Sequence, residues 1–214
     1  MTNINQYLKK IGLEGKKASR LMAKASTQQK NDALTHLIQL LNTKAKTILK
    51  ANEKDIQVAK KNKLDRASID RLIISTKTID SMIKGIQGIV DLKDPIGEIM
   101  HLNIRPSGIQ VGQMRVALGV IGMIYESRPN VTIDAASLSI KSGNAIILRG
   151  GSEAIHSNIA LSNIIHEALK KAGLSVQAVQ VIDSTDRSIV EAMIKLDNYI
   201  DVIIPRGGKS LTKM

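Results

Sequence analysis

The chain of 214 residues contains no cysteine, tryptophan or phenylalanine. Without cysteine it can form no disulfide and no thiolate-bound zinc or iron–sulfur centre, and it carries no cysteine nucleophile. Its only aromatic residues are three tyrosines, so a hydrophobic core must consist of Ile, Leu, Val, Ala and Met. With 43% hydrophobic and 23% charged residues, the composition is typical of a globular protein and excludes wholesale disorder.

The sequence also lacks a long apolar run. The longest such run, residues 116–125, has ten residues, whereas a membrane-spanning helix needs about 20. The opening residues MTNINQYLKK contain no apolar segment of the kind that directs secretion. We therefore predict a cytoplasmic protein with no membrane partner, and the length fits one large domain or two small ones.

Positive charge is in excess, with 31 Lys and Arg against 19 Asp and Glu, which gives a net charge of +12. Residues 1–63 carry +10 of this excess and residues 64–214 carry +2. A basic balance is typical of nucleic-acid-binding proteins, but no aromatic residues are interleaved with the lysines to stack on bases. We interpret the charge as a solvated helical surface that also attracts anionic substrates, and we do not expect nucleic acid as a partner.

Residues 1–100 are predicted to form a helical region that packs on a following cofactor domain. Ser26 followed by Gln29 resembles a capping box, and apolar residues then recur every three or four positions from Leu34 to Ile48. Further helices are expected near residues 52–61, 68–75 and 77–91. Asp94-Pro95 ends this region, because the residue before a proline resists helical geometry.

The remaining sequence predicts strands. Residues 101–118 read as a β-hairpin whose turn is Pro106-Ser107-Gly108. Residues 119–214 then alternate strands at 119–125, 144–149, 176–183 and 199–205 with helices at 131–143, 152–171 and 186–196. Single helices between strands imply right-handed crossovers and a parallel sheet. The predicted fold class is α/β, with a helical N-terminal region, a β-hairpin and a parallel βαβ sheet.

Three loops follow the expected strands at the edge where open parallel sheets bind ligands. They are residues 126–130, 149–153 and 205–210, and each contains an arginine. Two of them contain Gly-Gly before a helix start, where backbone N–H groups and the helix dipole favour a phosphate. Together the loops indicate an anionic, multiply phosphorylated ligand, and a dinucleotide fits. The G-x-G-x-x-G and P-loop motifs are missing, and the four histidines have no metal-ligand spacing, so no metal site is predicted.

The segments YESRPNVT, LRGGSEA and IIPRGGKS resemble gamma-glutamyl phosphate reductase, also called glutamate-5-semialdehyde dehydrogenase, of the aldehyde dehydrogenase superfamily. The resemblance covers essentially the whole chain and implies an aldehyde-dehydrogenase-like α/β domain that binds NADPH without the usual glycine fingerprint. Arg149 takes the position of a basic residue near the adenine ribose, where an arginine suits a 2′-phosphate.

The resemblance also implies which residues form the sites. Arg128 and Asn130 would meet the phosphate or acyl oxygen of L-glutamyl 5-phosphate. The implied substrate-binding residues are Glu126, Ser127, Arg128 and Asn130. The implied cofactor-binding residues are Arg149, Gly150, Gly151, Ser152, Glu153, Pro205, Arg206, Gly207, Gly208 and Lys209.

The family's reaction depends on a residue that this chain does not have. In the family, a cysteine thiolate attacks the acyl phosphate, phosphate leaves, and hydride from NADPH reduces the thioester to glutamate 5-semialdehyde in L-proline biosynthesis. That cysteine lies in the family's second half, beyond the IIPRGG motif. The resemblance also implies a homo-oligomer for full-length members of the family. We therefore expect a truncated reductase that lacks the C-terminal catalytic domain and has no catalytic residue of its own.

Two alternatives stay open beside a truncated enzyme. The chain could be a non-catalytic nucleotide-binding or interaction module derived from the reductase. The weaker alternative is a basic nucleic-acid-binding protein, for which salt-dependent retention of DNA or RNA without NADPH binding would be the diagnostic behaviour.

Overall fold

The structure is a computed structural model that describes residues 4–208. Its helical N-terminal part comprises α1 (Ile4–Met22), α2 (Thr27–Thr43), α3 (Ala45–Lys61), α4 (Arg66–Leu72) and α5 (Thr76–Asp91). A hairpin of β1 (Ile99–Ile104) and β2 (Gln110–Met114) follows. The last part comprises β3 (Val120–Tyr125), α6 (Asn130–Lys141), β4 (Ala145–Arg149), α7 (Ile155–Lys171), β5 (Val179–Val181), α8 (Ser188–Ile194) and β6 (Val202–Arg206).

The central element is a four-stranded parallel sheet with the strand order β5-β4-β3-β6. Helices α6, α7 and α8 connect its strands in turn, as the alternating pattern of the sequence predicts. Strand β4 is buried along its whole length, with Ile146, Ile147 and Leu148 each at most 2% exposed. The predicted α/β class and the aliphatic core are confirmed.

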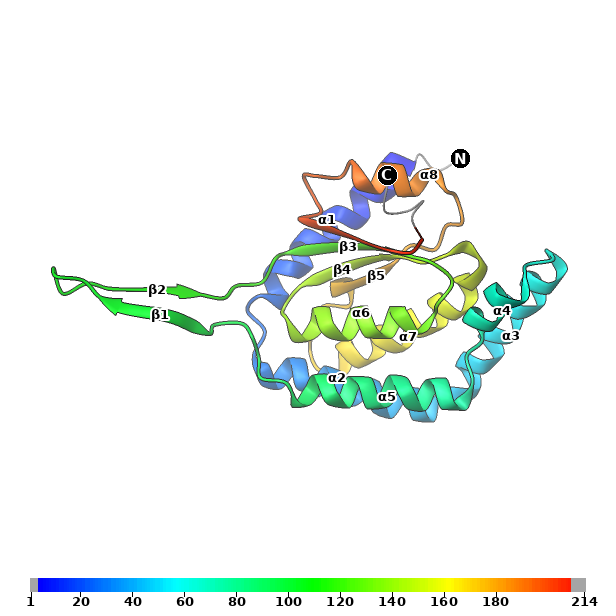
Figure 1. The fold of residues 1–214 in the computed structure, drawn as a ribbon, viewed down its shortest axis with the longest axis horizontal. Helices are drawn as coiled ribbons and strands as arrows, with labels where there is room; N and C mark the ends of the chain where they lie inside the picture. Colours follow the sequence, from blue (N-terminus) through cyan, green and yellow to red (C-terminus); the bar gives the residue numbers. More distant parts are fainter. Residues whose placement is uncertain (1–3, 209–214) are drawn as a thin grey trace.

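Helices cover both faces of the sheet (Figure 1). On one face α1 packs against β3, β4 and β5, with α8 beside it. On the other face lie α6 and α7, and α2, α3 and α5 form a further layer over these two helices. Gly12 permits the close packing of α1, because a Cβ there would lie 2.6 Å from the Cβ of Tyr199. Among residues 4–208, no helix is long and apolar enough to cross a membrane.

Capping side chains decide where several N-terminal helices begin. The predicted capping box is confirmed, since the Ser26 hydroxyl accepts a hydrogen bond from the Gln29 amide at 3.1 Å. The expected helix at 68–75 is wrong at both ends, because Asp65 caps a helix that starts at Arg66 and Ser75 caps the next helix. The apolar stripe from 34 to 48 spans two helices, with a break at Lys44.

Two later elements are shorter than the sequence predicts. The strand expected at 176–183 is reduced to β5, because the Ser175 hydroxyl caps a 3-10 turn over Val176–Ala178. The helix expected at 186–196 is the shorter α8. At its start, the Asp186 carboxylate accepts a hydrogen bond from the Ser188 amide at 2.9 Å. Both changes lengthen the loops at the sheet edges.

The predicted hairpin is present and forms a sheet of its own that projects from the body of the molecule (Figure 1). Its strands pair over 99–104 and 110–114, within bounds that differ slightly from those predicted, and the Gly108 amide donates to the Arg105 carbonyl at 2.8 Å to close the turn. The chain passes from the end of β2 to the start of β3. The hairpin therefore extends from the edge of the parallel sheet at which the strands begin. The candidate loops lie at the opposite edge.

Candidate functional site

The three predicted loops meet at the carboxyl edge of the sheet. Arg149 pairs with Ile124 and Arg206 pairs with Tyr125, so the ends of β4 and β6 flank the end of β3. Residues 126–130 follow β3, residues 150–154 follow β4, and Gly207 and Gly208 follow β6. The predicted Lys209 lies outside the described residues.

Hydrogen bonds join the loops to one another. The Glu126 amide donates to the Arg206 carbonyl at 3.3 Å, and the Glu126 carboxylate accepts a hydrogen bond from the Gly208 amide at 3.0 Å. The Ser127 hydroxyl donates to the Glu153 carboxylate of the second loop. Predicted substrate and cofactor residues therefore form one connected surface.

Arg149 is buried and faces the loop after β5. Its side chain donates to the Gly150 carbonyl and, at 3.5 and 3.4 Å, to the carbonyls of Thr185 and Asp186. Its Nε is buried without a hydrogen-bond partner among the described residues. Burial lowers the pKa of Arg149, and the charge of Glu153 acts in the opposite direction.

Arg187 is a further positively charged residue whose charge acts on Arg149, and sequence analysis did not single it out. It is exposed in the loop that leads into α8, and its charge lowers the pKa of Arg149, so the two guanidinium groups act on the same region. The sequence gives no signal for this proximity, because the two residues lie on different loops whose approach depends on the β4–β5 pairing.

The glycine pair after β4 makes room for buried polar side chains. A Cβ at Gly150 would lie 2.3 Å from the Asn158 amide nitrogen and 2.9 Å from the Tyr125 hydroxyl. Tyr125 donates to the Thr132 hydroxyl at 2.7 Å, because Thr132 donates its own proton to Asn158 at 2.9 Å. Burial raises the pKa of Tyr125 to about 12, so this hydroxyl keeps its proton.

The start of α7 is capped from another helix. Asp55 of α3, which is 2% exposed, accepts hydrogen bonds from the amides of His156 and Ser157 at 3.0 and 2.8 Å and from the Ser157 hydroxyl at 2.6 Å. This carboxylate satisfies the helix amides and balances the helix dipole. The amides at this helix start are therefore not free to bind a phosphate, and any anion site of the loop must use other donors.

Asn130 begins α6 and points its amide toward Asp134, to which it donates at 3.2 Å. Burial raises the pKa of Asp134, while the hydrogen bond from Asn130 and the charge of Arg206 act in the opposite direction. Asp134 thus holds the predicted substrate residue Asn130 in place, a role that the sequence alone does not reveal.

A cavity of about 370 Å³ lies beside the loops after β3 and β6. Its lining includes three arginines and one glutamate, and consists of Arg71, Glu126, Ser127, Arg128, Arg206 and Gly207. Arg71 comes from α4 in the N-terminal helical region, far from the predicted loops in the sequence. This cavity brings predicted substrate and cofactor residues together in one place.

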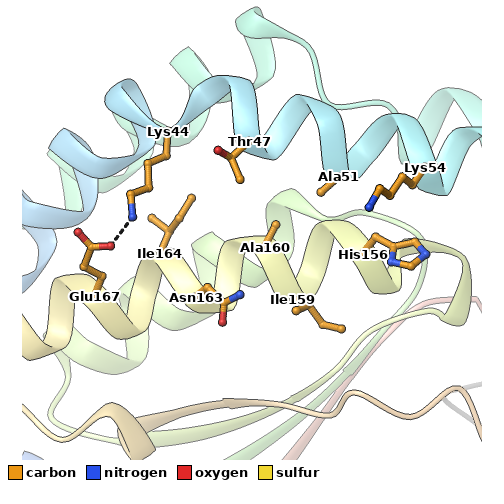
Figure 2. Close-up of a pocket in the computed structure, with 10 residues that line it drawn as sticks. All are labelled: Lys44, Thr47, Ala51, Lys54, His156, Ile159, Ala160, Asn163, Ile164 and Glu167. Carbon is orange, nitrogen blue, oxygen red and sulfur yellow. Dashed lines mark hydrogen bonds and ion pairs between the residues drawn. The ribbon is translucent and has the colours of Figure 1, made fainter.

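A second cavity, of about 310 Å³, lies in the groove between α3 and α7 (Figure 2). At one end Lys44 is paired with Glu167, and at the other end lie Lys54 and His156. Lys44 is already neutralised, so this groove has less capacity for an anion than the cavity beside the sheet edge.

No protein-family model matches the chain. Gamma-glutamyl phosphate reductase from Thermotoga maritima matches it with a TM-score of 0.94 and 40% identity, over 96% of this chain and 50% of that one. The reductase from Saccharomyces cerevisiae matches with a TM-score of 0.88 and 30% identity, over 95% of this chain and 52% of that one.

An acetylating aldehyde dehydrogenase from Geobacillus thermoglucosidasius shares the fold with a TM-score of 0.78 at 16% identity, over 100% of this chain and 45% of that one. The predicted aldehyde-dehydrogenase-like fold is confirmed. This chain spans about half the length of the two reductases. The resemblance inferred from the sequence is thus confirmed, and the chain is similar over nearly its whole length to one half of a gamma-glutamyl phosphate reductase.

Proposed function

We propose that this chain supplies the cofactor-binding half of a reductase that converts L-glutamyl 5-phosphate to glutamate 5-semialdehyde with NADPH. The observation that carries the proposal is the 40% identity and TM-score of 0.94 with the Thermotoga maritima reductase across 96% of this chain. The convergence of three arginine-bearing loops at the carboxyl edge of the sheet supports it, because parallel sheets bind ligands at that edge.

The residues present fit NADPH. Among residues 4–208 the buried Nε of Arg149 has no hydrogen-bond partner, and the charge of Arg187 acts on the same guanidinium, so the two positive charges suit a 2′-phosphate. The loops of residues 150–153 and 205–209 would hold the rest of the cofactor. When bound, NADPH supplies the hydride. The buried carboxylate of Asp55 keeps the second loop in place through the start of α7.

The substrate side of the site is the loop after β3. Asn130, held by Asp134, presents an amide that suits an acyl oxygen, and Arg128 presents a guanidinium that suits a phosphate. Ser127 and Glu126 are engaged with Glu153 and Gly208, so they fix the loop. These residues orient a substrate, and none of them is the thiol nucleophile of the family's reaction.

The absence of cysteine from the sequence favours a second candidate function, a nucleotide-binding module without catalysis of its own. The two candidates differ in what the chain does when it is joined to the rest of a reductase. A catalytic half restores activity in that setting, whereas a diverged module does not.

A chimera tests the proposal. The chain replaces the matching half of the Thermotoga maritima reductase, and NADPH oxidation is followed with L-glutamyl 5-phosphate, with the intact Thermotoga enzyme as control. We expect a chimera that consumes NADPH only when substrate is present. A chimera that unfolds cooperatively, as thermal denaturation would show, yet has no activity would overturn the proposed reaction and favour the module.

The isolated chain provides a second measurement. Because no other residue in the chain can take the place of the cysteine thiolate, we expect NADPH oxidation no faster than in a protein-free control. Turnover above that control would show that the nucleophile assignment is wrong.

A further inference from the structure

The loop after β5, residues 182–187, is tied to the first helix of the chain. The pairing of β5 with β4 ends where the Ile182 amide donates to the Leu148 carbonyl at 2.9 Å. At the next residue, the Asp183 carboxylate accepts a hydrogen bond from the Tyr7 hydroxyl of α1 at 2.6 Å, and the Asp183 amide donates to the same hydroxyl at 3.4 Å. Tyr7 therefore holds the loop at the point where it leaves the sheet.

The middle of this loop holds Arg149. The carbonyls of Thr185 and Asp186, both exposed residues, accept from the Arg149 guanidinium at 3.5 and 3.4 Å. The Asp186 carboxylate accepts the amide and the hydroxyl of Ser188 at 2.9 and 2.8 Å, which fixes the far end of the loop at the start of α8. Hydrogen bonds as long as those to Arg149 are near the limit of the interaction, so a small displacement of the loop breaks them.

Tyr7 is suited to fix the loop. Its partly buried ring packs against the hydrophobic core, and burial together with the hydrogen bond to Asp183 raises the pKa of the hydroxyl, so that it keeps its proton and donates. The same helix is fixed to β5 where the buried side chain of Gln180 donates to the Ile11 carbonyl at 2.9 Å. Helix α1 thus has a set position relative to the sheet, and Tyr7 transmits this position to the loop.

We propose that Tyr7 is a positioning residue for the cofactor site: through Asp183 it fixes the loop of residues 182–187, and through the carbonyls of this loop it sets the orientation of the Arg149 guanidinium. An arginine whose planar fork is already oriented loses less freedom when it binds a phosphate. The identity of the ligand, the 2′-phosphate of NADPH, rests on the proposed function. The orientation of Arg149 does not depend on it.

A nuclear magnetic resonance spectrum of the ¹⁵N-labelled chain without cofactor tests the orientation directly. The Nε–H signal of Arg149 is identified by its loss in Arg149→Met. Tyr7→Phe keeps the ring and removes the hydroxyl, and we expect it to shift this signal by more than its line width. Tyr199→Phe is the matched control, because Tyr199 is also partly buried and lies against Gly12 of the same helix. An Arg149 signal that Tyr7→Phe leaves in place, or that both variants shift equally, overturns the proposal.

Cofactor titration by calorimetry tests the consequence for binding. We expect Tyr7→Phe to weaken NADPH about fivefold, the effect of one lost hydrogen bond, and to leave NADH unchanged, because the ribose of NADH carries no 2′-phosphate for Arg149. Tyr199→Phe is expected to change neither affinity. Equal weakening of both cofactors by Tyr7→Phe would indicate general destabilisation of the chain and overturn the positioning role.

Two substitutions of Asp183 separate the hydrogen bond from the charge. Asp183→Asn and Asp183→Ala both remove the negative charge, but only Asp183→Asn keeps an acceptor for the Tyr7 hydroxyl. We expect Asp183→Ala to weaken NADPH as Tyr7→Phe does and Asp183→Asn to keep most of the affinity. Combining Tyr7→Phe with Asp183→Ala is expected to add no further loss, since both remove the same contact. Equal effects of the two Asp183 variants overturn the proposal.

The failure of the proposed function gives a different result. A parent chain that binds neither cofactor contradicts the proposed function, while the Arg149 signal still decides whether Tyr7 positions this side chain. Thermal unfolding guards against misfolding, and the midpoint of Tyr7→Phe is expected to stay close to that of Tyr199→Phe.

Discussion

Asp55 joins the N-terminal helices to the loop that follows β4. Its carboxylate accepts three hydrogen bonds at the start of α7, and the neighbouring Asn52 donates to the Ser157 hydroxyl at 3.0 Å and to the Leu72 carbonyl at 2.8 Å. Asn52 also accepts the Ile74 amide at 2.7 Å. This buried network fixes the position of the second loop relative to α4, and hence relative to Arg71.

Replacing Asp55 is expected to destabilise the whole fold. Asp55→Ala leaves two α7 amides without an acceptor and removes the acceptor of the Ser157 hydroxyl proton, which costs about 2–4 kcal/mol of the free energy of unfolding. Urea denaturation measures this loss. Asp80→Ala, which removes an exposed carboxylate from α5, serves as control and is expected to change stability by less than about 0.5 kcal/mol. Equal losses in the two variants would contradict the capping role.

Sequence reasoning reached only part of the site at the residue scale. The arginines 128, 149 and 206 are recognisable because each follows a predicted strand. Arg71 and Asp55 are not, because both lie on helices whose sequence carries no ligand motif, and only tertiary packing brings them to the sheet edge. The buried position of Arg149 was likewise not predictable, because it depends on carbonyls of the loop after β5.

At the scale of elements, Asp94 anchors the base of the hairpin to α2. Its carboxylate lies 2.5 Å from the Lys30 ammonium group, which is almost fully buried, and accepts the Thr27 hydroxyl at 2.7 Å and the Ile96 amide at 3.0 Å. Partial burial acts to raise the pKa of Asp94, but the hydrogen bonds from Lys30, Thr27 and Ile96 outweigh it and hold the pKa below its ordinary value.

The Asp94 anchor predicts a pH-dependent stability. A carboxyl group with a lowered pKa stabilises the folded state above its unfolded pKa of about 4 and loses this effect as the pH falls through its folded value. Asp94→Asn leaves the Lys30 charge buried without a partner, at a cost of about 3 kcal/mol near neutral pH. Urea denaturation from about pH 7 to pH 3 measures this cost. We expect the gap between parent and variant to close at the acid end, and a gap independent of pH would contradict the anchor.

Elements were predictable where the signal is local. Three features depend on residues that are close together in the sequence and were therefore predicted: the Ser26–Gln29 capping box, the turn at Pro106-Ser107-Gly108, and the alternation of strands and helices. The break at Lys44 was not predicted, because α2 and α3 share one continuous apolar stripe without a Gly or Pro between them. Their separation follows from packing, since both helices lie against α7.

At the scale of the whole molecule, the hairpin and the candidate site lie at opposite edges of the parallel sheet (Figure 1). The hairpin carries exposed apolar side chains, among them Leu102, Ile104 and Ile109, which are 58%, 74% and 63% exposed. Apolar exposure on this scale is typical of interaction surfaces. An assembly formed through the hairpin would leave the loops at the carboxyl edge free for ligands.

Cofactor binding by the intact chain tests the central claim most directly. Calorimetric titration with NADPH and NADH compares the parent chain with Arg149→Met, which keeps an apolar stem in the buried position, and with Arg105→Gln as control. We predict that NADPH binds more tightly than NADH and that Arg149→Met weakens NADPH about tenfold while leaving NADH unchanged. Equal affinity of the parent chain for the two cofactors, or an Arg149 variant that binds NADPH as the parent does, would contradict the account.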